Sequence, residues 1–233
     1  MSAPKAIVFD IETAPSKNAE LIIDETTRPD ARLKDPEKIR LNIVDKKAKA
    51  LSKAALHWST GQVFCVNFYD TEKNQHHFLY DRNEKNLLIA FGNKLEGDFI
   101  NHQTVAKNIE FDRPFLCGRY IVHDLGIPTV LRQTPVSQIQ DIEHFITRSK
   151  SSNQHAKLEA YALAMSVGNK TMSGSDVGDL YLKWIMEDDQ DAIKKLNEYC
   201  KRDVDITREV YRRGAKTFEP QAVTCESDIP FGA

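Results

Sequence analysis

KAIVFDIET, residues 5–13, is an apolar and β-branched run that ends in two acids. It predicts a buried β-strand, which Ala14-Pro15 closes. Because side chains alternate along a strand, the apolar odd-numbered residues are expected to face one side of a sheet. Asp10 and Glu12 then project together from the opposite face, near the carboxyl end of the strand.

The segments after this strand predict a mixed α/β fold. Residues 62–69 and 76–80 are expected to form a hairpin around a turn at 71–74. Further strands are expected at 99–105 and 138–142, and helices at 83–95, 158–167, 176–186 and 189–213. Strands followed by alternating helices indicate a mixed sheet flanked by helices.

Two charged segments also predict helix starts. Asp112-Arg113-Pro114 is typical of a start with Asp112 as N-cap, and that helix is expected to run to His123. Asp35-Pro36-Glu37 predicts a second helix, through Leu56, within a polar insertion at about residues 16–60.

Length and composition favour one globular domain. The chain has 233 residues, of which 41% are apolar and 28% charged, so disordered and coiled-coil proteins are excluded. A single domain is expected over residues 1–216, with a tail at 217–233. No apolar run approaches the roughly 20 residues that cross a membrane, and no signal-type stretch begins the chain.

Charge and cysteine content give weaker indications. The four cysteines form no C-x-x-C pair, which argues against a zinc site and fits a reducing cytoplasm, the expected location. The net charge is −2, so any nucleic-acid surface must be local. Basic residues gather at 34–53 and 194–216, where a solvated helix face is the alternative interpretation.

Three acidic elements stand out along the chain, although each has an ordinary explanation. Chance alone gives about five acid-x-acid pairs at this composition, so Asp10-x-Glu12 can be a strand end that reaches solvent. Asp112 can be a plain helix cap. Tyr199 and Asp203, at i and i+4 of a predicted helix, share one face, which is commonplace.

Taken together and in this order, the three elements resemble the motifs of the DEDD superfamily of 3′-to-5′ exonucleases. Residues 9–13 look like the first motif, residues 108–116 like the second, and residues 199–203 like the Y-x-x-x-D form of the third. The other subgroup has histidine five residues before the last aspartate, where this chain has Glu198.

The resemblance is therefore to the tyrosine subgroup, which includes ribonuclease D and the proofreading domains of family B DNA polymerases. Stand-alone exonucleases similar to the latter are most alike. The resemblance covers residues 5–13 and about 99–212, whereas the insertion departs from it. Residues 104–107 lack the glycine and histidine often found before the second motif.

The resemblance implies a ribonuclease-H-like fold and a site that holds two divalent ions, Mg²⁺ or Mn²⁺. Such hard ions prefer oxygen ligands, which fits four carboxylates. The implied ligands are Asp10, Glu12, Asp112 and Asp203. Tyr199 would position the attacking water first and act as a base second, and Thr13 and Asn108 would contact the terminal nucleotide.

The function expected from the resemblance is removal of nucleotides from the 3′ end of single-stranded DNA, with release of nucleoside 5′-monophosphates. One alternative is an exoribonuclease of the ribonuclease D type, and another is a non-catalytic nucleic-acid-binding module. Residues 226–231 resemble the acidic, Phe-ended tip of bacterial single-stranded DNA-binding proteins. A replication or single-strand-binding partner is therefore a hypothesis beside an ordinary surface tail, and no membrane partner is expected.

Other polar residues receive structural interpretations. His76 and His77 lie on a predicted strand, where neighbours face opposite sides and cannot easily chelate one metal, so both are interpreted as surface residues. Asp141 could approach the acidic cluster, but capping or scaffold duty is favoured.

Overall fold

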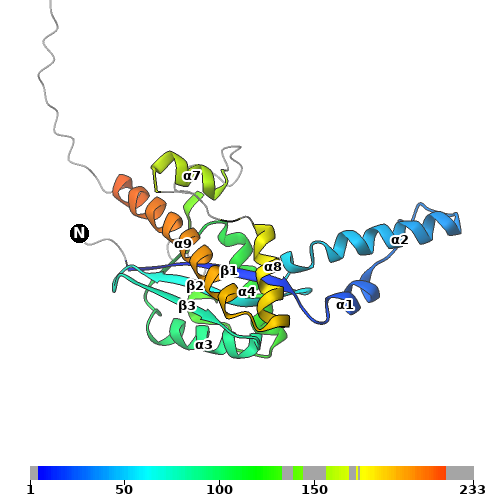
Figure 1. The fold of residues 1–233 in the computed structure, drawn as a ribbon, viewed down its shortest axis with the longest axis horizontal. Coiled ribbons are helices and arrows are strands. Elements are labelled where there is room, and N and C mark those ends of the chain that lie inside the picture. The colour runs from blue at the N-terminus through cyan, green and yellow to red at the C-terminus, as the bar shows by residue number, and fades with distance from the viewer. Residues whose placement is uncertain (1–4, 133–138, 144–155, 168–171, 173, 219–233) are drawn as a thin grey trace, which may run out of the picture.

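A five-stranded mixed sheet forms the centre of the protein (Figure 1). Its strand order is β3-β2-β1-β4-β5. The computed structural model describes residues 5–132, 139–143, 156–167, 172 and 174–218. The strands are β1 (Ala6–Pro15), β2 (Gly61–Asp70), β3 (Gln75–Tyr80), β4 (Gln103–Ala106) and β5 (Ile139–Asp141). β2 pairs antiparallel with β1 and β3, whereas β4 pairs parallel with β1 and β5. The expected mixed α/β fold is confirmed.

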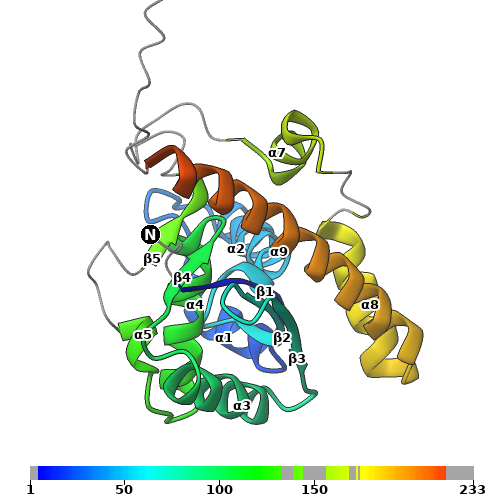
Figure 2. The same ribbon diagram turned by 90° about the vertical axis from the view of Figure 1, so that its left-hand side faces the viewer.

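Helices cover both faces of this sheet (Figure 2). One face carries α3 (Glu84–Gly97), α4 (Ile109–Val122) and α5 (Thr129–Arg132). The other carries α7 (Leu158–Met165), α8 (Gly174–Glu187) and α9 (Gln190–Phe218). None of the helices in the described ranges is long and apolar enough to cross a membrane.

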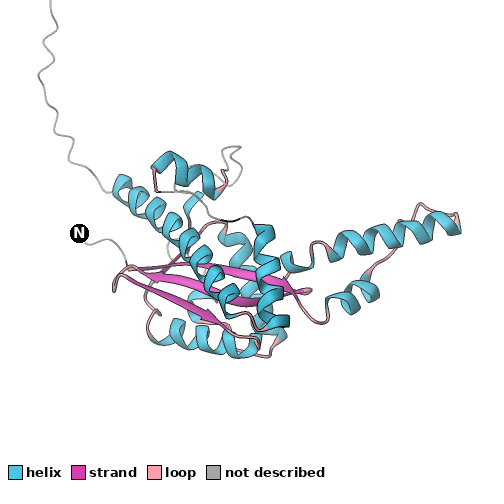
Figure 3. Cartoon of the chain, viewed as in Figure 1, coloured by secondary structure: helices cyan, strands magenta, loops and turns pink. Residues whose placement is uncertain are grey.

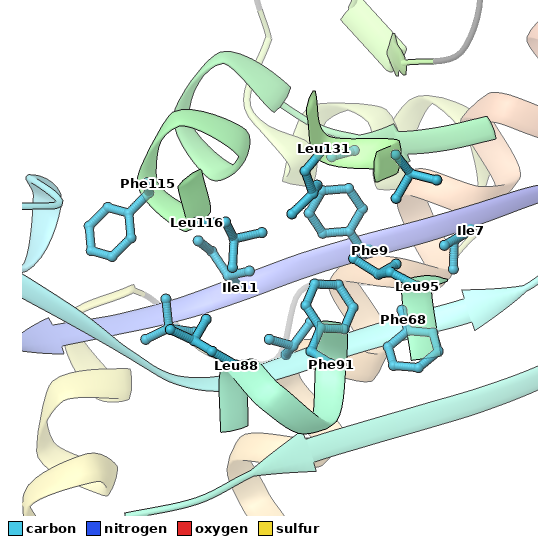
Figure 4. Close-up of a cluster of buried hydrophobic side chains, with 14 of the residues drawn as sticks. Ile7, Phe9, Ile11, Phe68, Leu88, Phe91, Leu95, Phe115, Leu116 and Leu131 are labelled. Atoms are coloured by element: carbon cyan, nitrogen blue, oxygen red, sulfur yellow. The ribbon is translucent and has the colours of Figure 1, made fainter. Parts of the chain in front are cut away.

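The alternation of β1 divides the core as the sequence predicts. Ile7, Phe9 and Ile11 pack against side chains of α3, α4 and α5 (Figure 4). Ala6 and Val8 pack on the opposite face, in a cluster with residues of α7 and α9. Asp10 and Glu12 share that second face, so the fold directs both carboxylates toward α9.

The insertion forms a projecting arm of α1 (Ala19–Thr26) and α2 (Pro36–Leu51) (Figure 3). α2 begins where it was predicted, and Asp35 caps it, since its side chain accepts hydrogen bonds from the N–H groups of Glu37 and Lys38. The helix ends at Leu51 rather than Leu56, and a short 3₁₀ turn, η1 (Ala54–Leu56), follows it. No α2 residue is fully buried, and Ala50 packs, partly buried, on a small cluster of Ala19, Ile23 and Ala54.

Two expected boundaries around the second motif are wrong. The strand expected at 99–105 is β4, which begins only at Gln103. The helix starts at Ile109 with Asn108 as its N-cap residue, in the left-handed region at φ 61°. Asp112 is thus a buried residue inside α4 and not its cap, and Pro114 lies inside the helix.

His76 and His77 are half-buried, so their interpretation as surface residues is wrong. Their rings do face opposite sides of β3, as expected. The His76 Nε2 atom lies 3.1 Å from the Asp205 carboxylate of α9, whereas the His77 ring stacks on Phe68 at 4.6 Å.

A buried polar network connects the segment that follows the arm, at Trp58, with β2, α3 and α4. The Glu84 carboxylate accepts hydrogen bonds from the Val63 N–H at 2.7 Å and from the Arg119 guanidinium at 2.6 and 2.9 Å. His123 Nε2 also lies 2.7 Å from it. Arg119 in turn donates to the Trp58 carbonyl at 2.8 Å, so this network positions α4 against the sheet.

Candidate active site

A pocket of about 300 Å³ lies where β1 and β4 meet α7 and α9, the elements that Figure 2 shows on one side of the sheet. Its lining residues come from four places in the sequence: Asp10, Lys107, Lys157, Leu158, Glu159, Asp203 and Thr207. Of the predicted catalytic residues, Asp10 and Asp203 line it, although 193 positions separate them in the chain.

Strand register explains why Asp10 and Lys107 meet. Val8 of β1 pairs with Val105 of β4 in parallel register, and both side chains are buried in the same cluster under α9. Two residues further along, at Asp10 and Lys107, the side chain is expected to point to that face again. Asp10, in the middle of β1, and Lys107, just after the carboxyl end of β4, therefore line the same pocket.

The third element supplies Asp203 and Tyr199 from successive turns of α9. Both residues are largely buried, and the Tyr199 hydroxyl hydrogen-bonds to the Asp203 carboxylate. Burial raises the pKa of the Tyr199 phenol far above its usual value, and the charges of Asp203, Glu12 and Asp10 raise it further. The phenol is therefore neutral at physiological pH and donates its proton to a hydrogen bond.

Asp112 lies behind the pocket, on α4 and 3% exposed. Its carboxylate accepts a hydrogen bond from the Ile11 backbone of β1. Burial raises the pKa of Asp112 well above its usual range, and the negative charge of Asp10 is the next largest cause. Two carboxylates that repel each other across a buried space favour a cation between them.

Glu12 faces the same helix as Asp10. The buried thiol of Cys200, on α9, donates a weak hydrogen bond to the Glu12 carboxylate at 3.7 Å. The Glu12 charge is also among the causes that raise the pKa of Tyr199. Glu12 thus belongs to the same electrostatic group as Asp10 and Asp203.

Thr13 and Asn108 do not line the pocket. Thr13 follows an irregularity in β1 pairing, where Glu12 pairs with Cys65 and Thr13 with Val63. Asn108 is exposed at the start of α4, and asparagine is one of the few residues that tolerate its left-handed conformation. Their contact with a terminal nucleotide stays a prediction.

The side chains at this site fit a hard divalent cation by their chemistry. All four predicted ligands offer carboxylate oxygens, which Mg²⁺ and Mn²⁺ prefer. Within the described ranges, however, no three His, Cys, Asp or Glu side chains are grouped closely enough to hold an ion as they stand. The four carboxylates therefore suit such ions by their chemistry, although no three of them are grouped as a ready binding site.

Asp141 has the scaffold role that was favoured for it. Its carboxylate accepts hydrogen bonds from the N–H groups of Ile109, at 3.1 Å, and Glu143, at 2.9 Å. It therefore caps α4, the duty that the sequence assigned to Asp112.

The sequence did not single out four polar pocket residues: Lys107, Lys157, Glu159 and Thr207. For Lys107 a signal existed, since it lies two residues after the buried Val105 and follows the end of a predicted strand. Thr207 is one helical turn beyond Asp203, to whose carbonyl its hydroxyl donates at 2.9 Å. Lys157 and Glu159 belong to a segment whose approach to β1 no local pattern predicts.

Comparison with known proteins agrees with this fold. A family model described as RNase_H superfamily matches residues 54–214, which include α4 and most of α9. An uncharacterized protein of Methanocaldococcus jannaschii is 30% identical over 139 residues, or 58% of this chain and 76% of that protein.

Among solved structures, the family B DNA polymerase of the hyperthermophilic archaeon Pyrobaculum calidifontis is similar. The TM-score is 0.57 at 15% identity. The match covers 91% of this chain but only 24% of the polymerase, so this chain corresponds to about a quarter of that protein. At this identity the match shows a shared fold.

Proposed function

The chain belongs to the RNase H superfamily, and we propose that it is a metal-dependent 3′-to-5′ exonuclease acting on single-stranded DNA. The observation that carries the proposal is the environment of Tyr199. The charges of Asp203, Glu12 and Asp10 all act on this one phenol, although two of them come from β1 and one from α9. A tyrosine surrounded by carboxylates beside a pocket is the arrangement expected of the tyrosine subgroup of DEDD exonucleases.

Asp10, Glu12, Asp112 and Asp203 would hold two ions, Mg²⁺ or Mn²⁺. Such ions, when bound, lower the pKa of the attacking water and neutralise charge on the phosphate and the leaving oxygen. The protein would supply the positions of the ligands: Asp10 and Glu12 of β1 face α9, which carries Asp203, whereas Asp112 approaches from α4, on the other side of the sheet. The raised pKa of Asp112 supports a cation at this place.

Tyr199 would orient the attacking water and not remove its proton. A general base must lose its own proton near the working pH, and burial among negative charges opposes this for Tyr199. Its hydrogen bond with Asp203 keeps the hydroxyl beside a ligand carboxylate. From there the hydroxyl can position a water molecule for in-line attack.

The pocket size favours attack at a strand end. At about 300 Å³ it lies at the lower end of the range for ligand sites, which suits one nucleotide and not a duplex. The preference for DNA over RNA rests on the likeness of the motifs to those of family B polymerases. A cytoplasmic location and a partner for residues 226–231, which lie outside the described residues, remain proposals from the sequence.

The deciding experiment compares four substrates under identical conditions: linear single-stranded DNA, RNA of the same sequence, circular single-stranded DNA and a DNA duplex. With Mn²⁺ or Mg²⁺, the 5′-labelled linear DNA should shorten stepwise and release mononucleotides, while the circle persists. EDTA and Asp10→Asn should each abolish the reaction.

Each other outcome identifies an alternative. Shortening of RNA alone would indicate an exoribonuclease. Cutting of the circle would indicate an endonuclease, which contradicts the proposal. Binding of both polymers with no cleavage under any metal would indicate a non-catalytic module.

A further inference from the structure

Lys107 lies two residues beyond Val105, the β4 partner of Val8, just as Asp10 lies two residues beyond Val8. It follows β4 directly and lines the pocket together with Asp10 and Asp203. Its ammonium lies 3.1 Å from the Glu143 carboxylate, and the two side chains are 24% and 10% exposed. A largely buried ion pair therefore forms part of the pocket wall, beside the proposed metal ligands.

Glu143 is itself held in place by the sheet. Its backbone N–H donates to the Asp141 carboxylate at 2.9 Å, and the same carboxylate caps α4 at Ile109. The position of Lys107 is thus coupled, through Glu143 and Asp141, to the helix that carries Asp112. An ammonium has three donors, and Glu143 needs one of them, so further oxygen acceptors can bind to Lys107.

We propose that Lys107, oriented by Glu143, is a phosphate-binding residue that holds a phosphate of the substrate strand in this pocket. The inference rests on the proposed function for the identity of its ligand. The charges of the lining residues support it: three acids, Asp10, Glu159 and Asp203, face two lysines, Lys107 and Lys157.

Charge repulsion explains why the pocket needs such a residue. A phosphodiester that enters brings another negative charge close to the carboxylates that line the pocket. An ammonium at the wall offsets this repulsion and fixes the strand, as lysine does in other phosphate sites. Its flexible stem lets the ammonium contact a phosphate oxygen while it stays near Glu143.

The test measures binding without cleavage. A fluorescent single-stranded DNA is titrated with protein in EDTA, between about 50 and 200 mM salt. Lys107→Gln should raise Kd about three- to tenfold at low salt and reduce the salt slope by about 0.7, since one ion contact on a single strand is lost. Lys107→Arg should keep the slope.

The matched control is Lys85→Gln, an exposed lysine on α3, which covers the opposite face of the sheet. It should leave both the Kd and the slope unchanged. Urea unfolding of all variants checks that each is folded, and if Lys107→Gln is not, Lys107→Gln combined with Glu143→Gln, which removes both charges of the ion pair, takes its place.

Chemically modified DNA identifies which phosphate of the strand Lys107 contacts. A neutral methylphosphonate replaces one linkage at a time, beginning at the 3′ end. Wild-type affinity should fall at one or two positions near that end, and Lys107→Gln should be insensitive at those positions because the contact is already absent.

Three results would overturn the inference: an unchanged salt slope in Lys107→Gln, an equal sensitivity of wild type and variant at every linkage, or no wild-type binding up to the highest protein concentration. Because these measurements need no cleavage, they are separable from the proposed function. A protein that shows the Lys107 pattern but never hydrolyses DNA would refute the nuclease and keep the phosphate site.

Discussion

The Asp141 carboxylate of β5 accepts a hydrogen bond from the Ile109 N–H of α4, at 3.1 Å and across 32 positions of the chain. The last strand therefore provides the cap of the helix that carries Asp112 three residues later. Since the N-terminal N–H groups of a helix lack partners within it, this contact fixes where α4 begins. A residue outside all three motifs thus positions one of the four carboxylates.

Asp141→Ala is expected to destabilise the protein by about 1–2 kcal/mol, because a buried helix cap is lost. It should also reduce nuclease activity, since Asp112 is no longer held in register with β1. Asp141→Asn keeps an oxygen acceptor and should cost less on both counts. Urea unfolding and initial cleavage rates measure the two effects, and equal losses in Ala and Asn variants would show that the negative charge matters more than the cap.

Asp112→Asn is expected to abolish activity yet stabilise the metal-free protein at neutral pH. The folded state raises the pKa of Asp112, so ionisation is more costly there than in the unfolded chain. This stability penalty appears as pH rises through the unfolded pKa, and a neutral amide removes it. Urea unfolding in EDTA at pH 7 measures the gain.

The matched control for that substitution is Asp179→Asn, at an exposed position of α8. It changes the net charge equally, and stability should stay within about 0.5 kcal/mol. A loss of stability in Asp112→Asn, with the control unchanged, would mean that the Asp112 carboxylate is favourably paired in the metal-free protein.

The sequence predicts the sheet well because its information is local. The alternation in residues 5–13 assigns each side chain to a face, and the structure confirms that assignment in its two separate core clusters. Turn and cap residues mark the hairpin and the start of α2 at Asp35. These features depend on residues within a few positions of each other.

The start of α4 was missed because it depends on a distant residue. Asp112 followed by Pro114 is a good local helix start, but the Asp141 cap allows the helix to begin at Ile109. Lys107 and Lys157 were missed for the same reason, since only tertiary contact brings both to Asp10. The order of the motifs along the sequence was enough to identify the carboxylates. The other residues of the pocket could be identified only from the folded structure.

Glu84→Gln is expected to destabilise the protein by about 3–5 kcal/mol, because Arg119 would remain buried without its counter-charge. The two side chains are 5% and 6% exposed, so solvent cannot replace the lost interaction. Glu84→Gln with Arg119→Met, which removes both charges, should recover part of the loss. Chemical denaturation measures the three variants, and strictly additive losses would show that the pair is not coupled.

His77→Phe should flatten the acid dependence of stability. Burial lowers the pKa of His77, so the unfolded chain binds this proton more readily than the folded protein. The neutral ring's contribution is complete above the unfolded pKa of about 6.5 and is lost as pH falls below it. Phenylalanine keeps the stack on Phe68 without a proton to bind. Unfolding free energies at pH 7 and 5 give the comparison, and an unchanged slope would exclude His77 as its source.

Tyr199→Phe is expected to lower kcat by up to about 100-fold with little change in substrate affinity, since only the hydroxyl that orients water is lost. The ring still packs between α9 and β2. Asp203→Asn removes a ligand charge and should cost more. Because burial and neighbouring charges raise the pKa of Tyr199, its phenol stays neutral through pH 9, and the two pH profiles should be parallel.

Single-turnover cleavage by wild type and both variants, from about pH 6 to 9, tests this role. A basic limb present in the wild type and absent from Tyr199→Phe would make the tyrosine a general base, contrary to the environment described above. A Tyr199→Phe rate equal to that of wild type at every pH would reduce Tyr199 to a packing residue. Assignment to the tyrosine subgroup would then lose its mechanistic support, while the carboxylate site would be tested separately by Asp203→Asn.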